Sequence, residues 1–210
     1  MNSGSKSSFS IGLDYSKDAL KLCKDALNSN EEFKKHNILF CRANCKNIPI
    51  KNDSIDKIFL LDIIEHLYPY ELKILMKEVH RILSTKGKII IHTNPNSWSM
   101  AYIYFLAKIF NIHRSKYGML HVNEQNILSI KNYLRDAGFI AKVWVEADIN
   151  FFEAILADKK VNKFIKYFVT WVVRLFNNKI TNVIINKSPL VYLFGNDIYA
   201  IAQKIMDESD

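Results

Sequence analysis

The chain of 210 residues is long enough for one ordinary domain, and 49% hydrophobic with 24% charged residues excludes a disordered protein. A formal net charge of +8 suits a phosphate-bearing ligand, nucleic acid or an anionic membrane surface without selecting among them. Cys23, Cys41 and Cys45 form no CxxC pair, which excludes a disulfide framework and a four-cysteine zinc site. No stretch reaches the roughly 18 apolar residues of a membrane span. We therefore expect a cytoplasmic protein, soluble or attached to a membrane surface.

Strand and helix patterns alternate along the chain. The predicted strands are short apolar runs over 8–14, 37–44, 56–64, 88–93, 139–146 and 195–204. The predicted helices have apolar residues at spacings of three and four and cover 17–30, 70–83 and 124–137. Ser16 and Asn123 suit N-caps, Pro69 a first helical position and Gly138 a helix end. The nearly continuous apolar run over 56–64 is typical of a strand buried on both faces.

This alternation predicts an α/β fold in which helices wind on both sides of a mostly parallel sheet. We expect a single domain over 1–210. Extra helices are expected near 99–112 and 151–180, outside the simple alternation.

One of these extra helices, over 161–177, has a narrow cationic stripe on an otherwise aromatic and aliphatic surface. The stripe carries Lys163, Lys166 and Arg174. This pattern is compatible with two roles: packing against the sheet, or peripheral contact with a membrane surface.

Four segments, in order along the chain, resemble motifs of the class I S-adenosylmethionine-dependent methyltransferases, in the type 11 group with an "EH" pair after the fourth strand. The segments are IGLDYS, RANCKNIPIKNDSIDKI, FLLDIIEHL and ILSTKGKIIIHTNPN. The resemblance covers about 9–145 and a final strand near 197–203. It implies a Rossmann-like methyltransferase fold, S-adenosylmethionine as the cofactor, and helical lid or insert segments at 99–120 and 148–190.

By this resemblance, Asp14 accepts both ribose hydroxyls of the cofactor, beside Tyr15. A carboxylate at a strand end is suited to two vicinal O–H donors. Asn44 occupies the position of the acidic residue that contacts the adenine amino group, and Cys45 offers its backbone N–H to the adenine ring. Without the resemblance, Asp14 is a turn residue that caps the next helix and Asn44 is an ordinary loop asparagine.

The third segment implies the reacting end of the site. By resemblance, Leu61 and Asp62 line the methionine part of the cofactor, and Glu65 and His66 form the "EH" pair. A histidine at this strand edge is suited to take a proton from an attacking hydroxyl or amine, although His66 could equally pack at a helix start. His121 matches a family position near the substrate opening. We expect no metal ion in the site, and His92 and His113 have no comparable support.

One family motif has no counterpart in this sequence. The family's first strand ends in a glycine-rich loop, and only eight mostly polar residues precede the predicted strand at 8–14. A strand, loop and crossover helix need roughly 30 residues. We therefore expect an N-terminally incomplete or truncated methyltransferase fold.

Two functions of different classes follow. The first is a methyltransferase acting on a small-molecule or lipid-linked acceptor, with His66 and His121 as the catalytic residues. The second is a truncated or degenerate methyltransferase-like chain without catalysis, acting as a binding or scaffold module. A nicotinamide dehydrogenase explains neither the segment around Pro49 nor the "EH" pair. Scattered Lys and Arg residues argue against nucleic acid as a partner.

Overall fold

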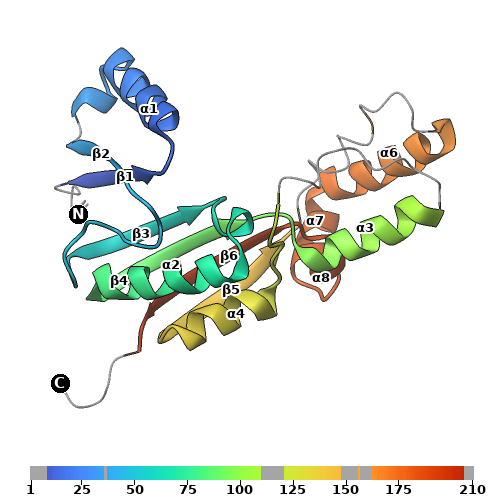
Figure 1. The fold of residues 1–210 in the computed structure, drawn as a ribbon. Helices are drawn as coiled ribbons and strands as arrows, with labels where there is room; N and C mark the ends of the chain where they lie inside the picture. Colours follow the sequence, from blue (N-terminus) through green and yellow to red (C-terminus); the bar gives the residue numbers. More distant parts are fainter. Residues whose placement is uncertain (1–8, 36, 110–120, 148–155, 157–161, 206–210) are drawn as a thin grey trace, which may run out of the picture. The chain divides into compact units, whose positions relative to one another are not determined.

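The computed structural model describes residues 9–35, 37–109, 121–147, 156 and 162–205. By its internal contacts the chain separates into two compact units, 1–51 and 52–210. Figure 1 shows the elements of each unit. The single domain over 1–210 stays a prediction.

The smaller unit is one strand–helix–strand motif. Its elements are β1 (Ser10–Asp14), α1 (Lys17–Ser29), the short 3-10 helix η1 (Phe33–Lys35) and β2 (Ile38–Arg42). The two strands are parallel, with Asp14 opposite Arg42, so both strands end at the same edge. The predicted cap is confirmed, because the Ser16 hydroxyl oxygen accepts a hydrogen bond from the Ala19 N–H at 3.2 Å.

The larger unit is built on a four-stranded sheet with the order β3-β4-β6-β5. The strands are β3 (Ile55–Leu61), β4 (Leu83–Thr93), β5 (Phe139–Glu146) and β6 (Asp197–Lys204). β3 is parallel to β4, and β6 is antiparallel to both β4 and β5. Three of these strands therefore run in one direction, which confirms the mostly parallel α/β sheet.

Two helices complete the core of this unit. α2 (Pro69–Ile82) begins at the predicted proline, and α4 (Ile127–Asp136) is followed by Gly138 with a φ of 85°. α4 packs on β5 and β6 and contacts α2. The core side chains are nearly all inaccessible and include Leu72, Met76, Val79, Ile89, Ile91, Ile130, Leu134 and Ile198. Burial of these apolar side chains stabilises the sheet whose edge carries the candidate site.

The extra helices are confirmed where the structure describes them. They are α3 (Ser97–Ile109), α6 (Lys163–Asn177), α7 (Lys179–Asn186) and α8 (Val191–Phe194). α3 contacts α8, α6 contacts α7, and α8 contacts β5. The expected helical stretches 110–112, 151–155 and 157–161 lie outside the described residues.

Two details of the sequence prediction are wrong. β3 is not buried on both faces, because Leu60 is buried while Phe59 and Leu61 are 58% and 52% exposed. β3 is an edge strand of its sheet. Within the larger unit, only one of its two faces is covered.

The cap of α4 is Asn126 rather than Asn123. The Asn126 side chain accepts hydrogen bonds from the N–H groups of Leu128 and Ser129. Asn123 lies three residues before this cap, and its own N–H donates to the carbonyl oxygen of Glu65.

Candidate functional site

Two of the predicted site residues lie where β3 ends. Leu61 is the last residue of β3, and Asp62 follows with a φ of 52°, a left-handed conformation that aspartate tolerates. The Asp62 N–H donates to the carbonyl oxygen of His92 at 3.0 Å, so the turn stays attached to β4. Both side chains are more than half exposed. They are therefore accessible at the carboxyl edge of the sheet, where α/β folds bind ligands.

Glu65 is a buried carboxylate in the 3-10 helix η2 (Ile64–His66). Its Oε2 accepts a hydrogen bond from the Thr93 hydroxyl at 2.6 Å. Its carbonyl oxygen accepts from the N–H groups of Val122 and Asn123, each at 3.1 Å. The bond from Thr93 satisfies the buried carboxyl group and links η2 to β4. The two backbone bonds link η2 to the segment that carries His121.

The two predicted catalytic histidines lie together. The ring centroids of His66 and His121 are 5.0 Å apart and the ring planes are tilted by 54°. His66 Nε2 is 3.9 Å from Oε1 of Glu65, and about half of the His66 side chain is exposed. The arrangement combines an accessible imidazole with a buried carboxylate behind it, which suits proton transfer near neutral pH.

The same cluster is the group among the described residues whose donors could hold a metal ion. The donor atoms of Glu65, His66 and His121 all lie within 4.8 Å of one another. The absence of a metal from the working site stays a prediction.

Sequence analysis missed His92, which the structure places beside the site. His92 Nδ1 is 2.8 Å from Oδ1 of Asp62, and His92 Nε2 is 3.4 Å from Oδ1 of Asp197. The imidazole therefore links the ends of β3 and β4 to the start of β6. The available signal was its position at the carboxyl end of the strand KIIIHT, next to the predicted edge.

The smaller unit brings together the four residues predicted for the adenosine part of the cofactor. Asp14 and Tyr15 end β1, and Asn44 and Cys45 follow β2 at the same edge. Asp14 Oδ1 accepts from the Ser16 N–H at 2.6 Å, and Asn44 Oδ1 accepts from the Lys46 N–H at 2.9 Å. These two bonds form the local turns that the sequence predicts for Asp14 and Asn44 when the resemblance is not considered.

The exposed side chains of Asp14 and Asn44 still suit a nucleoside. A carboxylate has about four acceptor sites and an amide oxygen two, so one local bond leaves room for ribose hydroxyls and an adenine amino group. A glycine cradle is missing from residues 9–51. Gly12 does not replace it, because a Cβ there would lie 2.7 Å from a ring carbon of Phe40. The described residues thus fit the adenosine part and supply no backbone cradle.

Comparison with known proteins identifies the domain family and the fold. Residues 4–91 match the family described as "Methyltransferase domain". This family supports S-adenosylmethionine as the cofactor. No curated protein matches the chain.

Several solved structures share the fold. An S-adenosylmethionine-dependent methyltransferase from Methanosarcina mazei has 14% identity and a TM-score of 0.61, covering 96% of this chain and 85% of its own. A methyltransferase of the same class from Archaeoglobus fulgidus has 20% identity and a TM-score of 0.53, covering 93% of this chain and 75% of its own. A geranyl diphosphate methyltransferase in complex with S-adenosylmethionine has 12% identity and a TM-score of 0.55, covering 93% and 68%. The resemblance inferred from the sequence motifs is confirmed.

Proposed function

We propose that this chain, a class I methyltransferase by its fold and its family match, transfers a methyl group from S-adenosylmethionine to a small-molecule or lipid-linked acceptor. The observation that carries the proposal is the cluster of Glu65, His66 and His121 at the carboxyl edge of β3. The cofactor supplies a methyl group on a sulfonium, which is already activated, so the protein contributes mainly positioning and proton removal.

In this proposal His66 accepts the proton of the acceptor hydroxyl or amine, with His121 beside it at the substrate opening. Glu65 is a positioning residue in this proposal, because its carboxylate is buried and lies 3.9 Å from Nε2 of His66. Asp14, Tyr15, Asn44 and Cys45 hold the adenosine part of the cofactor, and Leu61 and Asp62 its methionine part.

The extra helices are the proposed acceptor side of the site. Segments 99–120 and 148–190 form the lid, and their aromatic content favours an apolar or lipid-linked acceptor over nucleic acid. The geranyl diphosphate methyltransferase of the same fold is named for a substrate of this kind. We place the protein in the cytoplasm. The described residues contain no helix long and apolar enough to cross a bilayer.

Isothermal titration of the full chain with S-adenosylhomocysteine tests the cofactor assignment. We expect micromolar binding, and a loss of about tenfold or more in Asp14→Asn, since a charge-assisted bond to ribose hydroxyls is removed. Asp18→Asn, an exposed acid in the first turn of α1, makes the same charge change and should leave binding intact. Equal affinities of the two variants would remove Asp14 from the site.

Methyl transfer from labelled S-adenosylmethionine into lipid and aqueous extracts tests the role of His66. His66→Asn should lower incorporation by about a hundredfold or more while S-adenosylhomocysteine binding stays unchanged. His80→Asn, on α2, is the matched control and should retain the rate. A His66→Asn variant with full activity would show that this imidazole is not the base.

The second candidate is a non-catalytic binding or scaffold module. The observation that favours it is the close packing of Gly12 against the Phe40 ring, where an added Cβ would lie 2.7 Å from a ring carbon. Its signature in the same titration is no binding of S-adenosylhomocysteine by the chain. Binding without methyl transfer would also favour this candidate.

A further inference from the structure

α6 has three distinct faces. The buried or partly buried face contains Ile165, Val169 and Val173. At 100° per residue, Phe164, Tyr167, Phe168 and Trp171 form a second, aromatic face, and Lys163, Lys166, Thr170 and Arg174 form a third, cationic one. The buried or partly buried face of α6 therefore does not contain these four aromatic residues.

The aromatic face is open. Phe164, Tyr167, Phe168 and Trp171 are 75%, 80%, 52% and 58% exposed. The sequence is compatible with packing of this helix against the sheet or with contact to a membrane. The exposure of these four side chains shows that they do not pack in the core. Four half-exposed aromatic residues on a single helix face form the kind of contiguous apolar patch that marks an interaction surface.

The next helix extends the apolar character. On α7, Ile180, Val183 and Ile184 are 71%, 50% and 57% exposed, at helical spacings of three and four. α7 contacts α6 within the larger unit. Exposed aliphatic side chains beside aromatic ones favour a hydrocarbon environment over nucleic acid, whose bases stack on aromatic rings.

The positive net charge of the chain is concentrated in the segment that contains α6 and α7. Residues 159–196 contain seven of the 29 Lys and Arg residues and none of the 21 acidic residues, so they carry +7 of the net charge of +8. A second copy of this surface would meet the first with like charges. An anionic partner is the complementary one.

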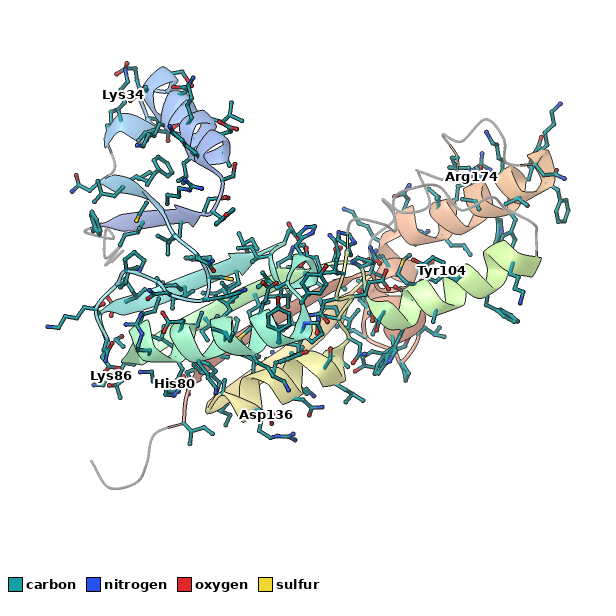
Figure 2. The ribbon with its side chains drawn as sticks, in the orientation of Figure 1. Lys34, His80, Lys86, Tyr104, Asp136 and Arg174 are labelled. Carbon is teal, nitrogen blue, oxygen red and sulfur yellow. The ribbon has the colours of Figure 1, made fainter. Side chains whose placement is uncertain are left out.

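The cationic face borders a groove that suits a phosphate group. Lys163, Lys166, Tyr167, Thr170, Trp171 and Arg174 line an open groove of about 360 Å³. Lys166 Nζ also donates to the carbonyl oxygen of Leu156 at 3.1 Å, which holds its ammonium at the groove. Arg174 lies on the same helix (Figure 2). The cationic side chains and the aromatic rings are therefore adjacent along the helix. Lipid headgroups and acyl chains are adjacent in the same way at a bilayer surface.

We propose that α6, continued by α7, is an interfacial membrane anchor that selects anionic phospholipid surfaces. Its aromatic face enters the headgroup boundary and its cationic face binds lipid phosphates. Membrane attachment would bring a lipid-linked acceptor to the lid helices, and this last step rests on the proposed function, whereas the attachment itself does not.

Co-sedimentation of the full chain with vesicles, without cofactor, tests the anchor. Vesicles of phosphatidylcholine with phosphatidylglycerol should bind the chain at least about tenfold more strongly than phosphatidylcholine alone, and added salt should weaken the binding. Lys163→Gln with Arg174→Gln should lower the partition coefficient by about tenfold or more. Phe168→Ala with Trp171→Ala should lower it on both vesicle types, because apolar insertion is lost.

Matched controls come from α4, where Lys131 and Arg135 are exposed cations and Leu128 is an exposed apolar residue. Lys131→Gln with Arg135→Gln, and Leu128→Ala, should leave vesicle binding unchanged. Circular dichroism checks that each variant is folded.

Several outcomes would overturn the anchor. They are no vesicle binding by the unchanged chain, an equal loss of binding in the α4 variants, and a concentration-dependent dimer in solution that the Phe168→Ala, Trp171→Ala pair abolishes. Tighter binding to single-stranded DNA than to anionic vesicles would also reject it in favour of a nucleic-acid surface. Because no cofactor is present, failure here leaves the methyl-transfer proposal standing, and the reverse also holds.

Discussion

At the scale of single residues, the candidate site depends on a charge held out of water. Glu65 is 1% exposed, and the Thr93 hydroxyl, itself inaccessible, donates to it. An ionised group that loses such a partner keeps the full cost of desolvation. The geometry of His66 and His121 is therefore coupled to a residue of β4 that touches neither ring.

Thr93→Val tests this coupling. The substitution preserves volume and removes the hydroxyl, so we expect the free energy of unfolding to fall by about 2 kcal/mol or more. Thr93→Ser keeps the hydroxyl and loses one methyl group, which should cost about 1 kcal/mol. Urea denaturation of the three proteins gives the comparison. If the serine variant is the less stable of the two, packing rather than the hydrogen bond dominates at this position.

His80, on α2, is a second residue whose environment affects stability. Desolvation by burial lowers its pKa below the ordinary value, the Lys204 ammonium lowers it further, and the Asp53 carboxylate opposes the shift. The folded protein thus binds fewer protons at this site than the unfolded chain. The stability it contributes is present above the unfolded pKa of about 6.5 and is lost as the pH falls from there to the lower folded pKa.

We expect His80→Gln to flatten the pH dependence of unfolding in this window. Urea midpoints measured from pH 7.5 down to about pH 5 should fall less for the variant than for the unchanged protein. Asp53→Asn should act in the opposite direction in the same pH window, because it removes the carboxylate that opposes the shift and so lowers the His80 pKa further. If the urea midpoints of His80→Gln and of the unchanged protein fell equally over this pH range, the folding of the chain would not shift the pKa of His80.

At the scale of elements, helix starts show what the sequence can and cannot predict. Ser16 and Pro69 were found from their own residue types, because capping and the first helical turn are local. Asn123 and Asn126 are the same residue type three positions apart. Asn126 caps the helix, whereas the N–H of Asn123 donates to Glu65, which lies in a distant part of the sequence, and such a long-range bond has no local sequence signal.

Substitution of the two asparagines separates these roles. Asn126→Ala removes the acceptor of the Leu128 and Ser129 N–H groups and should lower the free energy of unfolding by about 1 kcal/mol. Asn126→Asp should retain most of the stability. Asn123→Ala should cost nothing or stabilise slightly, because the buried Nδ2 of Asn123 has no hydrogen-bond partner among the described residues. Thermal unfolding checks this order, and a larger loss at Asn123 would restore it as the cap.

At the scale of the whole molecule, sequence analysis predicted the strands and the class of the fold but not the exposure of β3. Continuous apolar runs indicate a strand without showing how many neighbours or covering helices it has. His92 was missed for a related reason. Its partners Asp62 and Asp197 are far away in sequence. Asp62 meets it because β3 pairs with β4, and Asp197 meets it because β6 pairs with β4.

The two compact units should differ in local stability. The smaller one has a two-stranded sheet, and its buried apolar side chains among the described residues are Leu20 and Ile48. In the larger one, β4 and β6 each pair on both sides. Because local opening follows buried contacts and strand pairing, the backbone amides of β4 and β6 should exchange hydrogen at least about tenfold more slowly than those of β1 and β2.

Hydrogen exchange measured by mass spectrometry checks this difference, with β5 as the internal control, since it is an edge strand of the better protected sheet. S-adenosylhomocysteine should slow exchange at the ends of β1 and β2 if Asp14 and Asn44 bind it, because a ligand stabilises the state it binds. Uniform protection of all strands without ligand would show that the chain opens as one cooperative unit. In that case the division by internal contacts has no counterpart in stability, and the single domain expected over 1–210 is the better description.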